Sequence, residues 1–278
     1  MNTFCVSTAS YSGYSLPEAL ASIERLGERN VEFVADQLLA HGELDVSADF
    51  VKEAFLTTDL HCHSVAITNE TLDFSGHAEI QSLVTFSQHV GAKVLVLPVP
   101  ANDVMPDLLA NIQFVSEQFP NSIKILLENR GDQIECVVRG ELEFERVVAM
   151  LEKKGVAFAY NPANLFSNQP GVDLLRHAYS LVKNADYLVA QDSVIKNRHY
   201  LPVPVGKGIC RYDELFERFP SMIESRSISI RYPHRLYRNC HGEYGYRNVN
   251  MSIPELEKQL MQSISDIRMD ISESKLRH

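Results

Sequence analysis

The stretch Ile123-Lys-Ile-Leu-Leu-Glu-Asn-Arg-Gly131 decides the fold class, because a short aliphatic run ends directly in polar residues. Seven further runs of this kind lie along the chain, and longer stretches with apolar residues at helical spacing separate them. Eight strand-and-helix units in succession are typical of a (β/α)₈ TIM barrel, a single-domain α/β fold. In such barrels the active site lies at the carboxyl ends of the strands.

The expected strands are short, apolar and rich in β-branched residues: 4–7, 31–35, 59–65, 94–97, 123–128, 156–160, 187–191 and 227–231. The expected helices show apolar residues at helical spacing: 16–26, 48–55, 80–90, 105–119, 142–153, 172–182, 212–219 and 256–267. Glycines near helix C-termini (Gly27, Gly91 and Gly155) and prolines near helix N-termini (Pro17 and Pro254) agree with this register.

Composition limits the class of protein. No linker or composition break divides the 278 residues, so we expect one domain over 1–278. The hydrophobic content of 45% is enough for a large core, and no apolar run approaches the roughly 20 residues of a membrane span. The sequence shows no secretory signal pattern, so we expect a cytoplasmic protein with no membrane partner.

Charge and cysteine usage exclude two further classes. The formal net charge of −10 argues against a nucleic-acid partner, because such binding depends on lysines and arginines that neutralise phosphates. The five cysteines are scattered and form no C-x-x-C pair. This pattern argues against a disulfide framework and against a structural zinc site.

Polar side chains follow two neighbouring predicted strands. Glu128 comes directly after buried aliphatic residues, where a carboxylate is costly unless it is paired. We therefore expect Glu128 to be a base, a ligand to a cation or half of an ion pair. Asn161 and Asn164 follow the next strand, and their amides suit a hydroxylated ligand. Turn formation is the alternative interpretation of these two asparagines.

Two further predicted strands carry titratable residues. His61 and His63 lie two apart and therefore on the same side of their strand. We favour His63, the nearer to the strand end, as an acid, a base or a hydroxyl donor, and a core histidine is the alternative. Glu32 is an acid within an apolar strand. It contacts the ligand or pairs with a polar group of a neighbouring strand.

The segment 231–250 concentrates basic residues and contains only one acid. Its arginines and histidines are Arg231, His234, Arg235, Arg238, His241 and Arg247. Because it follows the last predicted strand, we expect Arg231, His234 and Arg235 to bind an anionic ligand group, a phosphate or a carboxylate. Pairing with acidic helices is the alternative.

The segment 192–209 is read as a long loop after the seventh strand. Long loops without secondary structure in compact domains are usually functional or disordered. Lys196 and Lys207 lie in it, together with glycines at 206 and 208. We expect this loop to act as a lid or as a phosphate contact.

Several motifs, in this order along nearly the whole chain, resemble the xylose isomerase-like TIM barrels, the superfamily of sugar-phosphate isomerases and epimerases and of type IV endonucleases. The motifs are Gly27 to Phe33, Ser75 to Pro98, Leu126 to Asn129, Tyr160 to Asn164, and Val205 to Gly208.

The resemblance implies divalent-metal chemistry at the barrel mouth, with Glu, Asp, His and Glu ligands after strands five to eight. Of these four, this sequence retains only Glu128. The other positions read Asn161, Gln191 in the stretch 189–192, and Arg231. A fixed guanidinium in place of carboxylates disfavours a divalent ion. We therefore expect no metal and no cofactor, with Arg231 reaching Glu128 and Gln191 among the substrate-binding residues.

These residues lead to a sugar-phosphate isomerase or epimerase-like hypothesis. Glu128 would move a proton at a carbon next to a carbonyl, while Arg231 and His63 stabilise the enediolate. The partner would be a small polyhydroxylated, anionic molecule, a sugar or sugar phosphate. A non-catalytic metabolite-binding or regulatory protein and a dehydratase or lyase are the alternatives, whereas the missing ligands disfavour a nuclease. The resemblance also implies a possible homo-oligomer.

Overall fold

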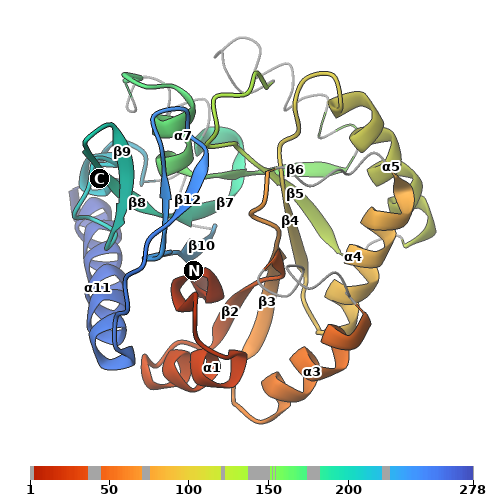
Figure 1. Ribbon diagram of the computed structural model, residues 1–278, viewed down its shortest axis with the longest axis horizontal. Coiled ribbons are helices and arrows are strands. Elements are labelled where there is room, and N and C mark those ends of the chain that lie inside the picture. The colour runs from red at the N-terminus through yellow and green to blue at the C-terminus, as the bar shows by residue number, and fades with distance from the viewer. Residues whose placement is uncertain are drawn as a thin grey trace.

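The computed structural model describes residues 3–36, 45–70, 76–119, 123–136, 151, 153, 155–173, 182–220 and 226–277. Eight parallel strands close into a barrel in the order β1-β10-β7-β6-β5-β4-β3-β2 (Figure 1). Each strand coincides with a run predicted from the sequence, which confirms the (β/α)₈ fold class. The strands are β1 (Thr3–Ser7), β2 (Asn30–Val34), β3 (His61–Ala66), β4 (Val94–Pro98), β5 (Lys124–Glu128), β6 (Val156–Tyr160), β7 (Ala185–Ala190) and β10 (Ser227–Ile230).

Helices surround the barrel (Figure 1). The described ones are η1 (Thr8–Tyr11), α1 (Leu16–Arg25), α3 (Asp45–Leu56), α4 (His77–His89), α5 (Met105–Gln118), α7 (Pro162–Asn168), α9 (Tyr212–Arg218) and α11 (Ile253–Arg277). The predicted helices 142–153 and 172–182 lie mostly outside the described residues. Among the described helices, none is long and apolar enough to cross a lipid bilayer.

Local sequence signals explain where α1 begins and ends. Ser15 and Glu18 form a capping box at its N-terminus. Gly27, just beyond the C-terminus, has a φ of +77°, a conformation that glycine adopts without strain. The buried residues Leu20 and Ile23 face the core, and each contributes about 2 kcal/mol to stability.

The alternation of side chains along each strand decides which residues face the inside of the barrel. On β5, Leu126 belongs to the inner apolar cluster, whereas Ile125 and Leu127 pack in the cluster that includes the helices. Because side chains alternate with a period of two, Glu128 shares the inward face of Leu126. It stands at the carboxyl end of the strand, where the barrel opens.

A second, antiparallel sheet of four strands follows the barrel strands β7 and β10. Its order is β12-β11-β9-β8, and its members are β8 (Asp192–Lys196), β9 (His199–Val203), β11 (Leu236–Arg238) and β12 (Tyr244–Tyr246). The prediction of a structureless loop over 192–209 is therefore wrong. Asn197 and Arg198 both have positive φ and form the two-residue turn of a β-hairpin, a geometry that matches the twist of its strands.

Candidate functional site

A buried ion-pair triad occupies the mouth of the barrel. Arg231, directly after β10, donates from Nη1 to Glu128 Oε1 at 3.0 Å, which confirms the predicted contact. Arg231 also donates to Glu32 Oε1, from Nε at 3.0 Å and from Nη2 at 2.9 Å. The side chains of Arg231, Glu32 and Glu128 are 3%, 0% and 5% exposed. Of the two roles left open for Glu32, the structure shows pairing with a polar group.

Two asparagines of the β6–α7 connection complete the surroundings of Glu128. Asn161 Nδ2 donates to Glu128 Oε1 at 2.8 Å, and Asn164 Nδ2 donates to the same oxygen at 3.2 Å. Asn161 Oδ1 also accepts from the backbone N–H of Asn164 and thereby caps α7. The local hydrogen-bonding role expected for these asparagines and the contact with the site are thus both present. Gln191 Oε1 lies 3.5 Å from Asn161 Nδ2, which brings Gln191 into the same cluster.

The charges of the triad do not cancel, because one guanidinium faces two carboxylates. Burial raises the pKa of the Glu128 carboxyl, and the neighbouring Arg231 only partly offsets this effect. Burial by itself would lower the pKa of Arg231, but Glu128 and Glu32 outweigh it and raise the pKa. Arg231 is therefore always charged, and the Glu128 carboxylate is a stronger base than a carboxylate in water.

Tyr187 of β7 supports the triad from deeper in the barrel. Its hydroxyl donates to Glu32 Oε2 at 3.2 Å and forms a hydrogen bond of 2.9 Å with Ser64 Oγ. Burial raises the pKa of the Tyr187 hydroxyl, which therefore stays protonated and available as a donor. Both oxygens of Glu32 are thus held, one by Arg231 and the other by Tyr187.

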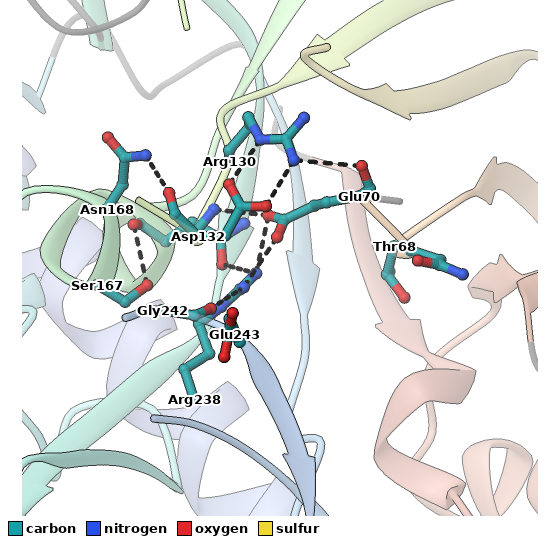
Figure 2. A network of polar contacts seen from close by, with 12 residues as sticks. Thr68, Glu70, Arg130, Asp132, Ser167, Asn168, Arg238, Gly242 and Glu243 are labelled. Carbon is teal, nitrogen blue, oxygen red and sulfur yellow. Dashed lines mark hydrogen bonds and ion pairs between the residues drawn. The ribbon is translucent and has the colours of Figure 1, made fainter. Parts of the chain in front are cut away.

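A second buried ion pair joins the β11–β12 hairpin to the segment after β3 (Figure 2). Arg238 Nη1 and Nη2 each donate to a carboxylate oxygen of Glu70 at 2.9 Å, and both side chains are 5% exposed. Arg238 also donates to the backbone carbonyl of Gly242 and to Asn164 Oδ1. Asn164 contacts both Arg238 and Glu128, so a single side chain links this ion pair to Glu128.

The residues after β5 lie against this second pair. Arg130 forms an ion pair with Asp132 and donates from Nη2 to the backbone carbonyl of Glu70 (Figure 2). A side chain at Gly242 would overlap the backbone carbonyl of Gly131, and Gly242 has a φ of +76°. Only glycine lets the hairpin approach this closely.

A narrow cavity separates the four-stranded sheet from the barrel mouth. Its wall consists of polar and apolar side chains from the hairpins, the end of β7 and the start of α7: Ala163, Gln191, Ser193, Tyr200, Pro202, Pro233, Leu236, Tyr237, Arg238 and Tyr244. The Tyr244 ring lies over the guanidinium of Arg238, with 3.9 Å between its centre and Cζ. Two residues of this wall contact the amides that hold Glu128, because Gln191 lies 3.5 Å from Asn161 Nδ2 and Arg238 donates to Asn164 Oδ1.

The structure places His63 away from the triad of Arg231, Glu32 and Glu128, so its predicted position at the mouth is wrong. His63 Nε2 lies 3.1 Å from the hydroxyl of Ser227, the first residue of β10, toward the opposite end of the barrel. A β-bulge explains the difference, because Val31 pairs with Cys62 whereas Glu32 already pairs with Ser64. The strand also continues to Ala66, so His63 lies in its first half.

Four further predicted residues make their described contacts with groups other than Glu128. Lys196 is at the turn of the β8–β9 hairpin, and Lys207 pairs with Asp266 of α11 at 3.2 Å. His234 donates from Nδ1 to the Ser10 carbonyl at 3.1 Å. Arg235 donates to the Val249 carbonyl at 3.1 Å and to Asn250. The arginine-rich segment is thus mostly occupied by contacts within the protein.

The sequence analysis did not single out Glu70, Tyr187 or Tyr244. Glu70 and Tyr244 lie outside the predicted strands, and no pattern marks them as neighbours of the mouth. Tyr187 carried a signal, because it is a polar aromatic residue at an inward position two residues before Val189. The period of β7 would have placed its hydroxyl inside the barrel.

Comparison with known proteins supports the fold. No family model matches the sequence, and no curated protein matches it. Solved structures match over nearly the whole chain. L-ribulose 3-epimerase superposes with a TM-score of 0.70 at 12% identity, covering 100% of this chain and 97% of that one. The 3-keto-D-glucoside 4-epimerase YcjR from E. coli superposes with a TM-score of 0.64 at 13% identity, covering 97% and 100%.

A xylose isomerase-like TIM barrel protein from Mycobacterium smegmatis, in complex with magnesium, gives a TM-score of 0.66 at 9% identity and covers 98% of both chains. This chain shares the (β/α)₈ barrel fold of these proteins. Because the identities are low, the likeness establishes the architecture, and the chemistry has to be argued from the residues.

The residues at the mouth of this barrel do not fit a divalent ion. The guanidinium of Arg231 lies between the carboxylates of Glu32 and Glu128, which would otherwise be the natural ligands. Within the described ranges, no three His, Cys, Asp or Glu side chains gather closely enough to hold a metal. A hard divalent ion needs several oxygen donors and is repelled by a fixed positive charge.

Proposed function

We propose that the protein is an isomerase or epimerase that moves a proton at a carbon next to a carbonyl group of a small polyhydroxylated compound, without a metal ion. The observation that carries this proposal is the buried contact of 3.0 Å between Arg231 and Glu128 at the barrel mouth. The site that barrels use for catalysis thus contains a base and a fixed cation. Two similar structures are named as epimerases of sugars, which supports the substrate class.

In the proposed reaction Glu128 removes the proton from the carbon next to the carbonyl. The electron pair of the C–H bond forms the C=C bond of an enediolate, and the π pair of the carbonyl moves to its oxygen. The raised pKa of Glu128 suits this step, because a general base works best when its pKa is near the operating pH. The hydroxyl proton on the neighbouring carbon then moves to the oxyanion, and Glu128 returns its proton to the former carbonyl carbon, which completes an aldose–ketose isomerisation.

The developing oxyanion needs hydrogen-bond donors and positive charge. Each Nη of Arg231 carries two hydrogens, and among the described contacts Nη2 donates only to Glu32. Its second hydrogen can donate to the enediolate oxygen. Because Glu32 and Glu128 fix the guanidinium in advance, little reorganisation is needed when the charge forms.

The proposal does not extend to an anionic substrate. The sequence pattern suggested that arginines after β10 bind a phosphate or a carboxylate. In the structure, Arg231 pairs with two glutamates and Arg238 pairs with Glu70. While Glu128 is ionised, neither guanidinium at the mouth has a charge to spare for an anionic group of the substrate. Arg231 can stabilise the enediolate because Glu128 becomes neutral when it takes up the proton.

A metabolite-binding protein without catalysis is the second candidate. One observation favours it, because Arg231, Asn161 and Asn164 all donate to Glu128, which weakens a carboxylate as a base. This candidate predicts that sugars raise the melting temperature without being converted. The dehydratase alternative uses the same proton abstraction and differs in that water leaves afterwards.

Hydrogen–deuterium exchange separates these candidates. The protein is incubated in D₂O with a panel of ketoses and aldoses, and ¹H NMR follows deuterium incorporation next to the carbonyl. We expect exchange by the wild-type protein and a loss of about 100-fold or more in Glu128→Gln, which keeps the shape and removes the base. Glu243→Gln, an exposed glutamate of the β11–β12 hairpin, is the matched control. Undiminished exchange by Glu128→Gln would refute the assignment.

A further inference from the structure

The cavity between the barrel mouth and the four-stranded sheet has features of a ligand subsite. Its polar wall includes Gln191, Ser193 and Arg238, and its apolar wall includes Pro202 and Leu236. A few fixed polar groups on a largely apolar wall are typical of small-molecule sites. Gln191 connects the cavity to Asn161, whose amide contacts Glu128.

Two residues of this wall each have one buried polar atom without a hydrogen-bond partner among the described residues. The atoms are Oγ of Ser193 and Nε of Arg238, and both residues are 4% exposed. A buried donor without a partner costs free energy, so native proteins nearly always satisfy such groups. Both atoms can donate a hydrogen bond, and a bound oxygen acceptor would satisfy them.

The electrostatics of Arg238 limit the kind of acceptor. Its guanidinium already forms two hydrogen bonds of 2.9 Å with Glu70, and the Gly242 carbonyl accepts a third. The charge of Arg238 is therefore compensated, while its Nε can still donate. An anion bound there would find no free countercharge in a desolvated site, whereas a carbonyl, hydroxyl or ether oxygen loses little on desolvation.

The remainder of the wall indicates what carries this oxygen. Pro202, Pro233 and Leu236 offer apolar surface, and Tyr200 and Tyr237 add aromatic surface. The cavity is narrow and has room for about one water molecule. A larger group therefore requires apolar side chains of the wall, such as Leu236, to turn aside, with the pair of Arg238 and Glu70 left in place.

We propose that this cavity binds the non-reacting end of the ligand, an uncharged oxygen-bearing group carried on an apolar or aromatic ring. This proposal rests on the proposed function in one respect, namely that the ligand in the cavity is the substrate of the reaction at Glu128. Binding to the cavity is measured without turnover, so the two proposals can fail separately.

Benzamide and benzoate form a matched pair of probes, because they share shape and differ in charge. Binding is measured by saturation-transfer NMR and titration. The wild-type protein is expected to bind benzamide at least tenfold more tightly than benzoate. Equal or tighter binding of benzoate, or no binding of either probe, would overturn the proposal.

Two variants test the residues that carry the argument. Glu70→Gln frees the charge of Arg238 and is expected to shift the preference toward benzoate by tenfold or more, whereas the control Glu243→Gln leaves it unchanged. Ser193→Ala removes one donor and is expected to weaken benzamide by about fivefold. Each variant is used only if it melts cooperatively. A preference unchanged in Glu70→Gln, or benzamide binding unchanged in Ser193→Ala, contradicts the proposal.

Discussion

Replacing Arg231 by methionine tests the triad most directly, because it removes the charge and keeps much of the side-chain volume. Arg231 makes four hydrogen-bond contacts of 2.9 to 3.2 Å with Glu32 and Glu128. All three side chains are almost fully buried, so the substitution leaves two carboxylates without a partner cation. Breaking a buried pair in this way costs about 3–5 kcal/mol.

The cost is expected to depend on pH in a defined direction. Without Arg231, burial and the repulsion from Glu32 hold the folded-state pKa of Glu128 above the value of about 4.3 in unfolded chains. A carboxyl whose pKa is raised on folding is least destabilising when it is protonated. The free energy of unfolding of Arg231→Met therefore falls as pH rises from about 4.5 to 7.

Urea denaturation followed by circular dichroism at pH 5 and pH 7 measures this effect. Arg25→Met is the control, because Arg25 pairs with Glu257 at the surface and such pairs contribute about 0–1 kcal/mol. A loss at position 231 no larger than that of the control, or a loss independent of pH, would show that the triad is not the buried charge cluster described above.

Two further variants test contacts at the barrel mouth and in the hairpin beside it. Arg231→Ala leaves the carboxylates of Glu32 and Glu128 facing an open space. Mn²⁺ is therefore expected to raise the melting temperature of this variant and not that of the wild type. Equal responses of the two proteins would contradict the view that the guanidinium takes the place of a divalent ion. Gly242→Ala is expected to destabilise the protein by more than 1 kcal/mol, because the new methyl group overlaps the Gly131 carbonyl at a positive φ; an unchanged urea midpoint would contradict the close approach of the hairpin.

The barrel and part of its site were predictable because they depend on local periodicity. Runs of β-branched residues located all eight barrel strands, and the approximate position of Glu128 and Arg231 after two of them placed both at the mouth. The contact with Glu32 was one of two stated alternatives, and only the structure decided between them.

Other features of the site depend on a bulge, a long-range ion pair and a turn, which the hydrophobic periodicity of the sequence does not indicate. One bulge next to Glu32 shifts the register of β3, and together with the continuation of the strand to Ala66 it changes the place of His63. The pair Glu70 and Arg238 spans 168 positions and joins two segments without regular periodicity. The β8–β9 hairpin depends on a turn whose second residue, Arg198, is an uncommon choice for positive φ.

The triad also constrains how the chain is made and how it diverges. Arg231 is 199 residues from Glu32 and 103 residues from Glu128, so a nascent chain carries both acids long before their shared counterion is synthesised. The barrel can close only after β10, its last strand in the sequence, has been synthesised. During evolution Arg231 is the most constrained member of the triad, because its replacement leaves two buried carboxylates without a counterion, whereas the loss of either glutamate leaves a balanced pair.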